Sequence, residues 1–170
     1  ADTVEGGKAY ILRGHVDAFR NRGEFDRAVS TAMIIESPHA LAAALCEIAR
    51  AQNRARKKDA ATATLQKAVE AVNEQKDHQA SSLIDIADIF NEMGDGGRAV
   101  ELLSRALREH LNFEHPDESG YYRKDISVEY VKAGKIETGI EIARGIDPKG
   151  VFIGVSNRNS AFGEIARTLA

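Results

Sequence analysis

Apolar and polar residues alternate along this chain with the period of amphipathic helices. Within Leu83–Leu107, apolar residues recur at spacings of three, four and seven, first from Leu83 to Phe90 and again from Ala99 to Ala106. An α-helix turns once in about 3.6 residues, so these spacings place the apolar residues on one helix face. The polar stretch between the two stripes contains glycines, which commonly end helices. The pattern therefore predicts two helices joined by a short turn.

The same pair of stripes occurs several times along the sequence. A shift of 38 residues brings Leu45–Val69 onto Leu83–Leu107, and shifts of 40 residues downstream and 33 upstream extend the series. Repeats of this length are typical of arrays in which each helix hairpin packs on its neighbours. We expect one all-α domain over residues 1–170, with repeats at about 8–37, 38–75, 76–114 and 117–147 and a final helix at 159–170.

A glycine motif between the two helices of the third repeat resembles a nucleotide-binding loop. Gly94–Ala99 has the letters GDGGRA, which match G-x-G-x-x-G/A. That fingerprint needs a strand before it, whereas a predicted helix precedes Gly94. Gly94 instead aligns with Gly23 and Gly134, each at the end of a helical stripe. We predict that these glycines end helices in the left-handed conformation and that Asp95 caps the next helix.

One segment has the composition of a β-strand. Val151–Ser156 has the letters VFIGVS and is the sole candidate of its kind in the sequence. A lone strand has no partner, so we expect no sheet to be built from it.

The repeated residues resemble the tetratricopeptide-repeat (TPR) family. Its first helix carries a bulky residue, an aliphatic one, a small one, an aromatic one and then a turn glycine, and its second helix carries small, bulky and small residues. The third repeat supplies Leu83, Ile86, Ala87, Phe90, Gly94, Ala99, Leu103 and Ala106 at these places. The resemblance implies a right-handed α–α superhelix of about four hairpins plus a final helix, with a HEAT-like array as the alternative.

The match to that family is degenerate. The repeat periods are 33, 38, 40 and 39, whereas the family's usual period is about 34. Tryptophan is absent from the sequence. In the second repeat, Gln52 replaces the aromatic residue and Arg56 replaces the turn glycine. These departures affect the expected pitch of the superhelix more than its class.

The charge, the lengths of the apolar runs and the cysteine content of the sequence limit the kinds of partner and the cellular compartments that we expect. The 170 residues carry a formal charge of −3, which argues against a nucleic-acid partner because such proteins are usually basic. No apolar run approaches the roughly 20 residues of a membrane span. The single Cys46 excludes an internal disulfide bond. We favour a cytoplasmic location, with a periplasmic one open if a signal peptide has been removed.

Candidate binding residues follow from the resemblance, which implies that the first helices line a concave face for extended peptides or a partner's helix. Asn53 and Asn91 are equivalent, and an amide both donates to and accepts from a peptide backbone. The family's carboxylate clamp is not expected, because Asp17 stands where it would repel that ligand. The candidates are the first-helix positions off the packing stripe: Arg13, Asp17, Arg20, Arg50, Asn53, Asp88, Asn91 and Lys124.

The sequence thus predicts a non-catalytic interaction module for a protein or peptide, without cofactor or metal, either monomeric or dimeric through its terminal helices. An RNA-binding helical repeat is the alternative, although Asp17 and Asp88 on the proposed face argue against it. A small metal-dependent helical enzyme is the third hypothesis. It rests on Glu109–Glu118, where His110 and His115 stand among acids. Their spacing of five does not place both histidines on one helix face.

Overall fold

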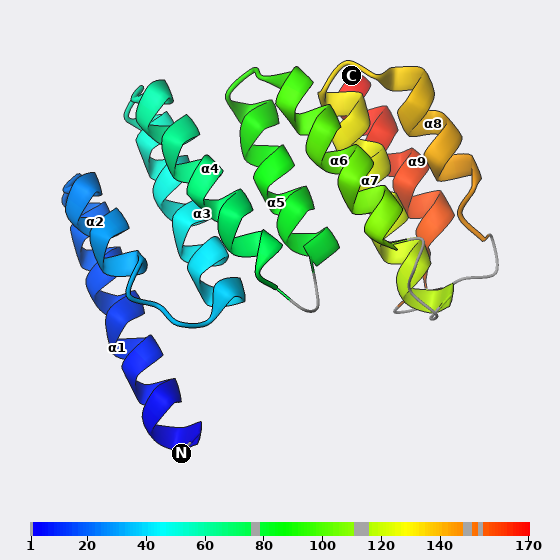
Figure 1. The fold of residues 1–170 in the computed structure, drawn as a ribbon. Coiled ribbons are helices and arrows are strands. Elements are labelled where there is room, and N and C mark those ends of the chain that lie inside the picture. The colour runs from blue at the N-terminus through cyan, green and yellow to red at the C-terminus, as the bar shows by residue number, and fades with distance from the viewer. Residues whose placement is uncertain (1, 76–78, 111–115, 148–150, 153–154) are drawn as a thin grey trace. The chain divides into compact units, whose positions relative to one another are not determined.

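The computed structural model describes residues 2–75, 79–110, 116–147, 151–152 and 155–170, which are almost entirely helical (Figure 1). The chain divides into two compact units, Ala1–His78 and Gln79–Ala170, which are described separately below. Among the described residues, every helix is too short or too polar to form a transmembrane span.

Unit 1 consists of two helix hairpins. Ser37 begins the second hairpin as an N-cap, with its side chain accepting a hydrogen bond from the Ala40 N–H at 3.3 Å and Pro38 in the first turn. Val16, Leu45 and Leu65 are buried between the helices. The helices are α1 (Asp2–Asn21), α2 (Phe25–Ala32), α3 (Pro38–Arg54) and α4 (Lys58–Asn73).

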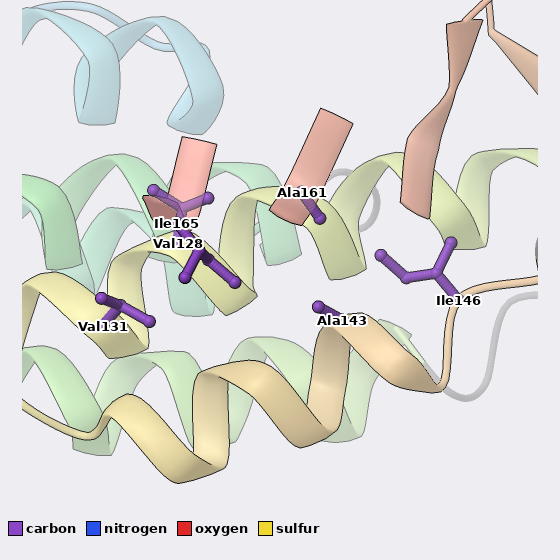
Figure 2. Close-up of a cluster of buried hydrophobic side chains, with 6 residues drawn as sticks. All are labelled: Val128, Val131, Ala143, Ile146, Ala161 and Ile165. Atoms are coloured by element: carbon purple, nitrogen blue, oxygen red, sulfur yellow. The ribbon is translucent and has the colours of Figure 1, made fainter. Parts of the chain in front are cut away.

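Unit 2 contains two further hairpins and a last helix that packs on the second of them. Figure 2 shows the buried cluster that joins α7, α8 and α9, made by Val128, Val131, Ala143, Ile146, Ala161 and Ile165. The last helix therefore completes the core at this end of the unit. The elements are α5 (Gln79–Glu92), α6 (Gly96–His110), α7 (Pro116–Lys132), α8 (Ile136–Arg144), β1 (Val151–Phe152), β2 (Val155–Ser156) and α9 (Asn157–Leu169).

The two short strands correct one expectation. Val151 pairs with Ser156 and Phe152 with Val155 in an antiparallel ladder. The expectation that this segment builds no sheet is wrong, because Val151–Phe152 and Val155–Ser156 supply both strands of the ladder. The ladder is only two residues long, so the predicted all-α class is unaffected.

All four hairpins turn through the same backbone motif. Gly23, Gly94 and Gly134 have φ values of +74°, +81° and +79°, and Arg56 has a φ of +60° at the equivalent place. At the third turn, Gly94 N–H donates to Asn91 O at 2.9 Å and Asp95 N–H donates to Phe90 O at 2.8 Å. This pair of bonds is the Schellman motif. The prediction of left-handed glycine turns is confirmed.

The predicted cap at Asp95 is also confirmed. Its Oδ1 accepts a hydrogen bond from the Arg98 N–H at 3.2 Å. The bond satisfies one of the backbone donors that a helix leaves open in its first turn. The motif that resembles a nucleotide fingerprint is therefore a helix C-terminus followed by an N-cap.

Arg56 provides a test of the backbone conformation. We expect Arg56→Gly to raise the free energy of unfolding by about 0.5 kcal/mol, because relief of the left-handed strain exceeds the extra entropy of a glycine in the unfolded chain. Gly23→Ala, in the same unit, should lower it by about 1 kcal/mol for the converse reason. A Cβ at Gly23 meets no atom within 4 Å, so its cost is conformational. Urea unfolding measures both, and equal signs for the two variants would contradict the account.

Small residues lie where the two helices of a hairpin approach each other. Ala49, Ala61, Ala87 and Ala99 are fully buried at these places, as the repeat pattern predicts. In the fourth hairpin the position is Gly139, where an added Cβ would lie 2.6 Å from Ser127 O and 2.6 Å from Val131 Cγ2. Helices α7 and α8 are therefore closer at this point than a methyl group allows.

The predicted repeat boundaries remain a prediction. The second and third helix pairs lie inside the expected ranges. In the other repeats α1 begins at Asp2, before the expected start at 8, and α7 begins at Pro116, one residue before 117. Helix α9 begins at Asn157, two residues before the expected start at 159. The chain divides into two compact units. Whether these units form a single domain, as expected from the sequence, also remains a prediction.

Candidate functional site

In unit 1, a glutamate gathers several of the predicted binding residues. Arg20 Nη1 donates to Glu47 Oε2 at 3.1 Å, and Arg20 Nη2 pairs with Asp17 at 3.2 Å. Arg50 Nη1 lies 3.9 Å from the other oxygen of Glu47. Glu47 thus links α1 and α3 and brings Arg20 and Arg50 together. Arg13 is exposed and Asn53 is half-buried outside this network.

In unit 2, the predicted residues Asp88 and Asn91 join α5 to α7. Lys132 Nζ donates to Asp88 at 3.0 Å and to Glu129 Oε1 at 2.6 Å. Asn91 Nδ2 donates to Glu129 O at 3.0 Å and to Glu129 Oε2 at 2.9 Å. Both N–H groups of Asn91 are therefore engaged inside the unit, and its Oδ1 is buried without a hydrogen-bond partner among the described residues. Contact between Asn91 and a partner protein stays a prediction.

The predicted residue Lys124 joins α7 to α9. Its Nζ lies 2.9 Å from Asp125 Oδ1 and 3.2 Å from Glu164 Oε1, and it stands 5.4 Å from the centroid of the Tyr121 ring. Ser160 Oγ also donates to Glu164 Oε1 at 3.3 Å. Lys124 is thus held by carboxylates on two helices.

These contacts surround a cleft of about 210 Å³ that we call the acidic cleft. Its wall carries five carboxylates and one lysine. Five negative charges and one positive charge give the wall a formal charge of −4. The residues come from α5, α7 and α9, which are the first helices of successive repeats. The lining is Ile84, Asp85, Asp88, Asp125, Val128, Glu129, Lys132 and Glu164.

Three of these acids occupy one repeat position. Asp85, Asp125 and Glu164 each lie one residue before the aliphatic position of their first helix, and Glu47 is their equivalent in unit 1. The four acids are separated by 38, 40 and 39 residues, which are the repeat periods themselves. These acids are not among the predicted binding residues, although their repeat spacing is visible in the sequence. Glu129 was missed for a different reason, because its importance depends on its burial.

Burial and pairing set the ionisation of the cleft. Burial raises the pKa of Asp125 and of Glu129 above the ordinary carboxyl value, although neighbouring lysines oppose the shift. Burial also lowers the pKa of Lys124 and Lys132, but the carboxylates bonded to them outweigh this effect, and both lysine pKa values lie above their ordinary value. The lysines therefore stay charged at neutral pH, while the half-buried Asp125 and the buried Glu129 take up protons more readily than exposed carboxylates do.

The part of the chain that the structure describes contains no candidate metal-binding site. No three His, Cys, Asp or Glu side chains gather there in an arrangement that suits a metal ion. Most of the segment Glu109–Glu118, on which the metal hypothesis rests, lies outside the residues whose side chains are described. Cys46 is buried.

Comparison with known proteins identifies the fold. No protein-family model and no curated protein matches this sequence. A Podosopora anserina chain with nearly identical TPR-like repeats, named as a kinesin light chain, matches with a TM-score of 0.54, 19% identity and coverage of 95% of this chain and 85% of that one. A single-substitution variant of it gives a TM-score of 0.60, 19% identity and coverage of 95% and 84%. The fold is that of a TPR-like helical repeat protein.

A third solved structure also matches the fold of this chain. Ton1535 from Thermococcus onnurineus NA1 gives a TM-score of 0.68 at 18% identity over 94% of this chain. The TPR-like chain described here spans 46% of the length of Ton1535. The predicted TPR-like resemblance and fold class are confirmed.

Proposed function

We propose that this TPR-like chain is a non-catalytic interaction module that binds a peptide or a partner helix along its first helices, and that the acidic cleft takes a positively charged segment of that partner. The residues predicted from the sequence in unit 1, namely Arg13, Asp17, Arg20, Arg50 and Asn53, belong to the same proposal as contacts to the partner.

The acids at one repeated position carry this proposal. Asp85, Asp125 and Glu164 come from three successive first helices and line one cleft. Lys124 and Lys132 neutralise part of this charge, and a net negative charge remains. A half-exposed ion pair contributes only about 0.2–1 kcal/mol. Several pairs together therefore select the sign of the partner's charge and speed its association, rather than supplying most of the affinity.

The same charges disfavour the RNA hypothesis. An RNA-binding surface gains most of its affinity from contacts between basic side chains and phosphates. Five carboxylates line the cleft, and they would repel a phosphate backbone. A protein segment with lysine or arginine side chains is the polymer whose charge complements this surface.

Charge reversal at the rim of the cleft tests the proposal. We expect a lysine- and arginine-rich 12-residue peptide to bind with an affinity that falls about tenfold in Asp85→Lys, because one attraction becomes a repulsion. Asp85 is exposed on α5, so the substitution should leave the fold intact. Fluorescence anisotropy of a labelled peptide at several salt concentrations measures the change.

A matched variant and two other ligands complete this test. Glu101→Lys makes the same charge change at an exposed position on the second helix α6, and it should change the affinity less than about twofold. A peptide with glutamate in place of each basic residue should not bind. Tight, strongly salt-dependent binding of single-stranded RNA, or equal losses in both variants, would overturn the proposal.

A further inference from the structure

In two of the hairpins, an arginine of the second helix lies over an aromatic ring of the first. The guanidinium carbon of Arg27 stands 4.2 Å from the centroid of the Phe19 ring, and that of Arg98 stands 5.5 Å from the centroid of the Phe90 ring. Both rings hold the aromatic position of their repeats, and both arginines come one residue before the small position of the second helix. A guanidinium over a ring is a favourable cation–π contact.

The second hairpin lacks both members of this pair. Gln52 stands at the aromatic position and Ala60 at the arginine position. Both residues line a cavity of about 360 Å³. A cavity of about 150 Å³ is enough to bind benzene, so this one has room for an aromatic ring. The cavity therefore lies beside the two positions at which the hairpins α1–α2 and α5–α6 stack a ring against a guanidinium.

The opposite wall of the cavity comes from the first hairpin of the same unit, which lies beside the second (Figure 1). The wall consists of the turn after α1 and the first residues of α2, Gly23–Arg27, and Lys57 completes the lining. Lys57 Nζ stands 5.1 Å from the centroid of the buried Phe25 ring. Both hairpins are complete. Each repeat of such an array packs only on its neighbours, so a further helix of the array would not fill a space between two repeats that already pack together.

Gln52 places an unsatisfied amide in the wall of this cavity. Its exposed fraction is 2%, and its Oε1 is buried without a hydrogen-bond partner among the described residues. A buried polar atom without a partner is destabilising, so a ligand that hydrogen-bonds the amide gains affinity by satisfying it. A tyrosine hydroxyl both donates and accepts, and it can therefore pair with either end of the amide.

Positive charge gathers around the cavity. Arg54 and Arg56 lie beside Lys57 in the turn from α3 to α4, and all three residues are exposed. None of the three forms an ion pair with another residue that the structure describes. In the wall of the cavity, two acids balance two bases, so the two arginines leave an excess of positive charge. Carboxylates on either side of the tyrosine would complement this charge.

We propose that this cavity, which we call the Gln52 pocket, binds the tyrosine side chain of an acidic segment of a partner protein. The ring enters the space beside Gln52 and Ala60, and its hydroxyl hydrogen-bonds the Gln52 amide. The flanking carboxylates of the segment pair with Lys57 and Arg56. The Gln52 pocket shares no residue with the acidic cleft and takes a segment of the opposite charge, so its test is independent of the first proposal.

A short glutamate-rich peptide with one central tyrosine is the probe, and fluorescence anisotropy of a labelled copy measures its affinity. Phenylalanine in place of the tyrosine should weaken binding about fivefold, because the Gln52 amide loses its partner, and alanine should weaken it about tenfold or more. In Gln52→Met, which has no amide, the tyrosine and phenylalanine peptides should bind equally. NMR of the whole chain should show a shift of the Gln52 side-chain amide signal on binding.

Filling the pocket should block it. Gln52→Phe supplies the ring that the aromatic position carries in other repeats, so the fold should be kept, as urea unfolding would show, while peptide binding is lost. Lys57→Glu should weaken binding about tenfold. Lys67→Glu makes the same charge change at an exposed position on α4, and it should change the affinity less than about twofold.

Three kinds of result would contradict the proposed occupant. Undiminished binding to Gln52→Phe, equal binding of the tyrosine and alanine peptides, or no binding at all would overturn the inference. Single-stranded RNA that binds more tightly than the peptide and loses its affinity in Lys57→Glu would overturn it in favour of a nucleic acid. Self-association of the chain that Gln52→Phe abolishes would overturn it in favour of a second copy.

Discussion

Replacing Gly139 by alanine should lower the free energy of unfolding by about 2 kcal/mol, although alanine is the better helix former by about 1 kcal/mol. The new methyl group would lie 2.6 Å from the Ser127 carbonyl oxygen and from Val131 Cγ2. The valine side chain can rotate away, but the carbonyl belongs to the backbone of α7. The hairpin would therefore have to open, which loosens the cluster that α7 and α8 share with α9.

Gly163→Ala is the matched control for this substitution. Gly163 lies inside α9, and a Cβ there meets no atom within 4 Å. The change should therefore raise the free energy of unfolding by about 0.5–1 kcal/mol through helix propensity alone. Urea unfolding monitored by circular dichroism gives both values. A gain in stability for Gly139→Ala similar to that of the control would show that α7 and α8 are further apart than described.

Removing the Glu129 side chain should also lower the stability of the folded chain. Glu129→Ala should lower the free energy of unfolding by about 2 kcal/mol, because Asn91 and Lys132 each lose a buried acceptor. The exposed fraction of the Glu129 side chain is 8%, against 39% for Lys132, so solvent compensates the lysine only in part. Glu129→Gln keeps an oxygen for the Asn91 amide, and it should change stability by less than about 1 kcal/mol at neutral pH.

The pH dependence of the free energy of unfolding, compared between the unmodified chain and Glu129→Gln, separates the effect of the Glu129 charge from that of its packing. Burial holds the pKa of Glu129 above its ordinary value of 4.5, so the folded chain binds this proton more tightly than the unfolded chain does. The contribution of Glu129 to stability is therefore fully present below pH 4.5 and is lost as the pH rises through the raised pKa. Asp125 contributes with the same sign.

Unfolding curves from pH 4 to pH 8 measure this difference. The stability of Glu129→Gln relative to the unmodified chain should rise as the pH passes from 4.5 through the raised pKa of Glu129 and level off above it, since glutamine has no proton to lose. Asp125 is present in both proteins, so its contribution largely cancels in the comparison. A difference that stays flat with pH, or that falls, would show that burial does not raise the pKa of Glu129.

Features that recur in the sequence could be predicted from it. The stripes of each helix, the turn glycines Gly23, Gly94 and Gly134, and the Asp95 cap are local or repeated, so the alignment of repeats identifies them. Arg56 is a clear case, because the repeat alignment places it at the turn-glycine position and its φ is positive there. The strand pair in Val151–Ser156 was missed because six residues gave too short a signal to suggest a hairpin.

The candidate site was harder to predict because it depends on contacts between repeats. The predicted set included Asp88, Asn91 and Lys124, which border the acidic cleft or its ion pairs. It omitted Glu129, whose role arises from burial and from the Asn91 amide one repeat away. Periodicity identifies which residues lie off the buried face of each helix, but it does not show which of these residues contact one another between helices. The Gln52 pocket likewise depends on two hairpins, because the turn of the first supplies its opposite wall.

The acids at the repeated position also imply a rule about the sequence of a partner. Packed helices lie about 8–10 Å apart, and a peptide in the polyproline II conformation advances about 3.1 Å with each residue and completes one turn in about three residues. Such a peptide lying across α5, α7 and α9 would therefore pass from Asp85 to Asp125 to Glu164 in steps of about three residues. Lysine or arginine at every third position would point to the same side and meet all three carboxylates in turn, whereas basic residues at every second position would turn away from the cleft after the first contact.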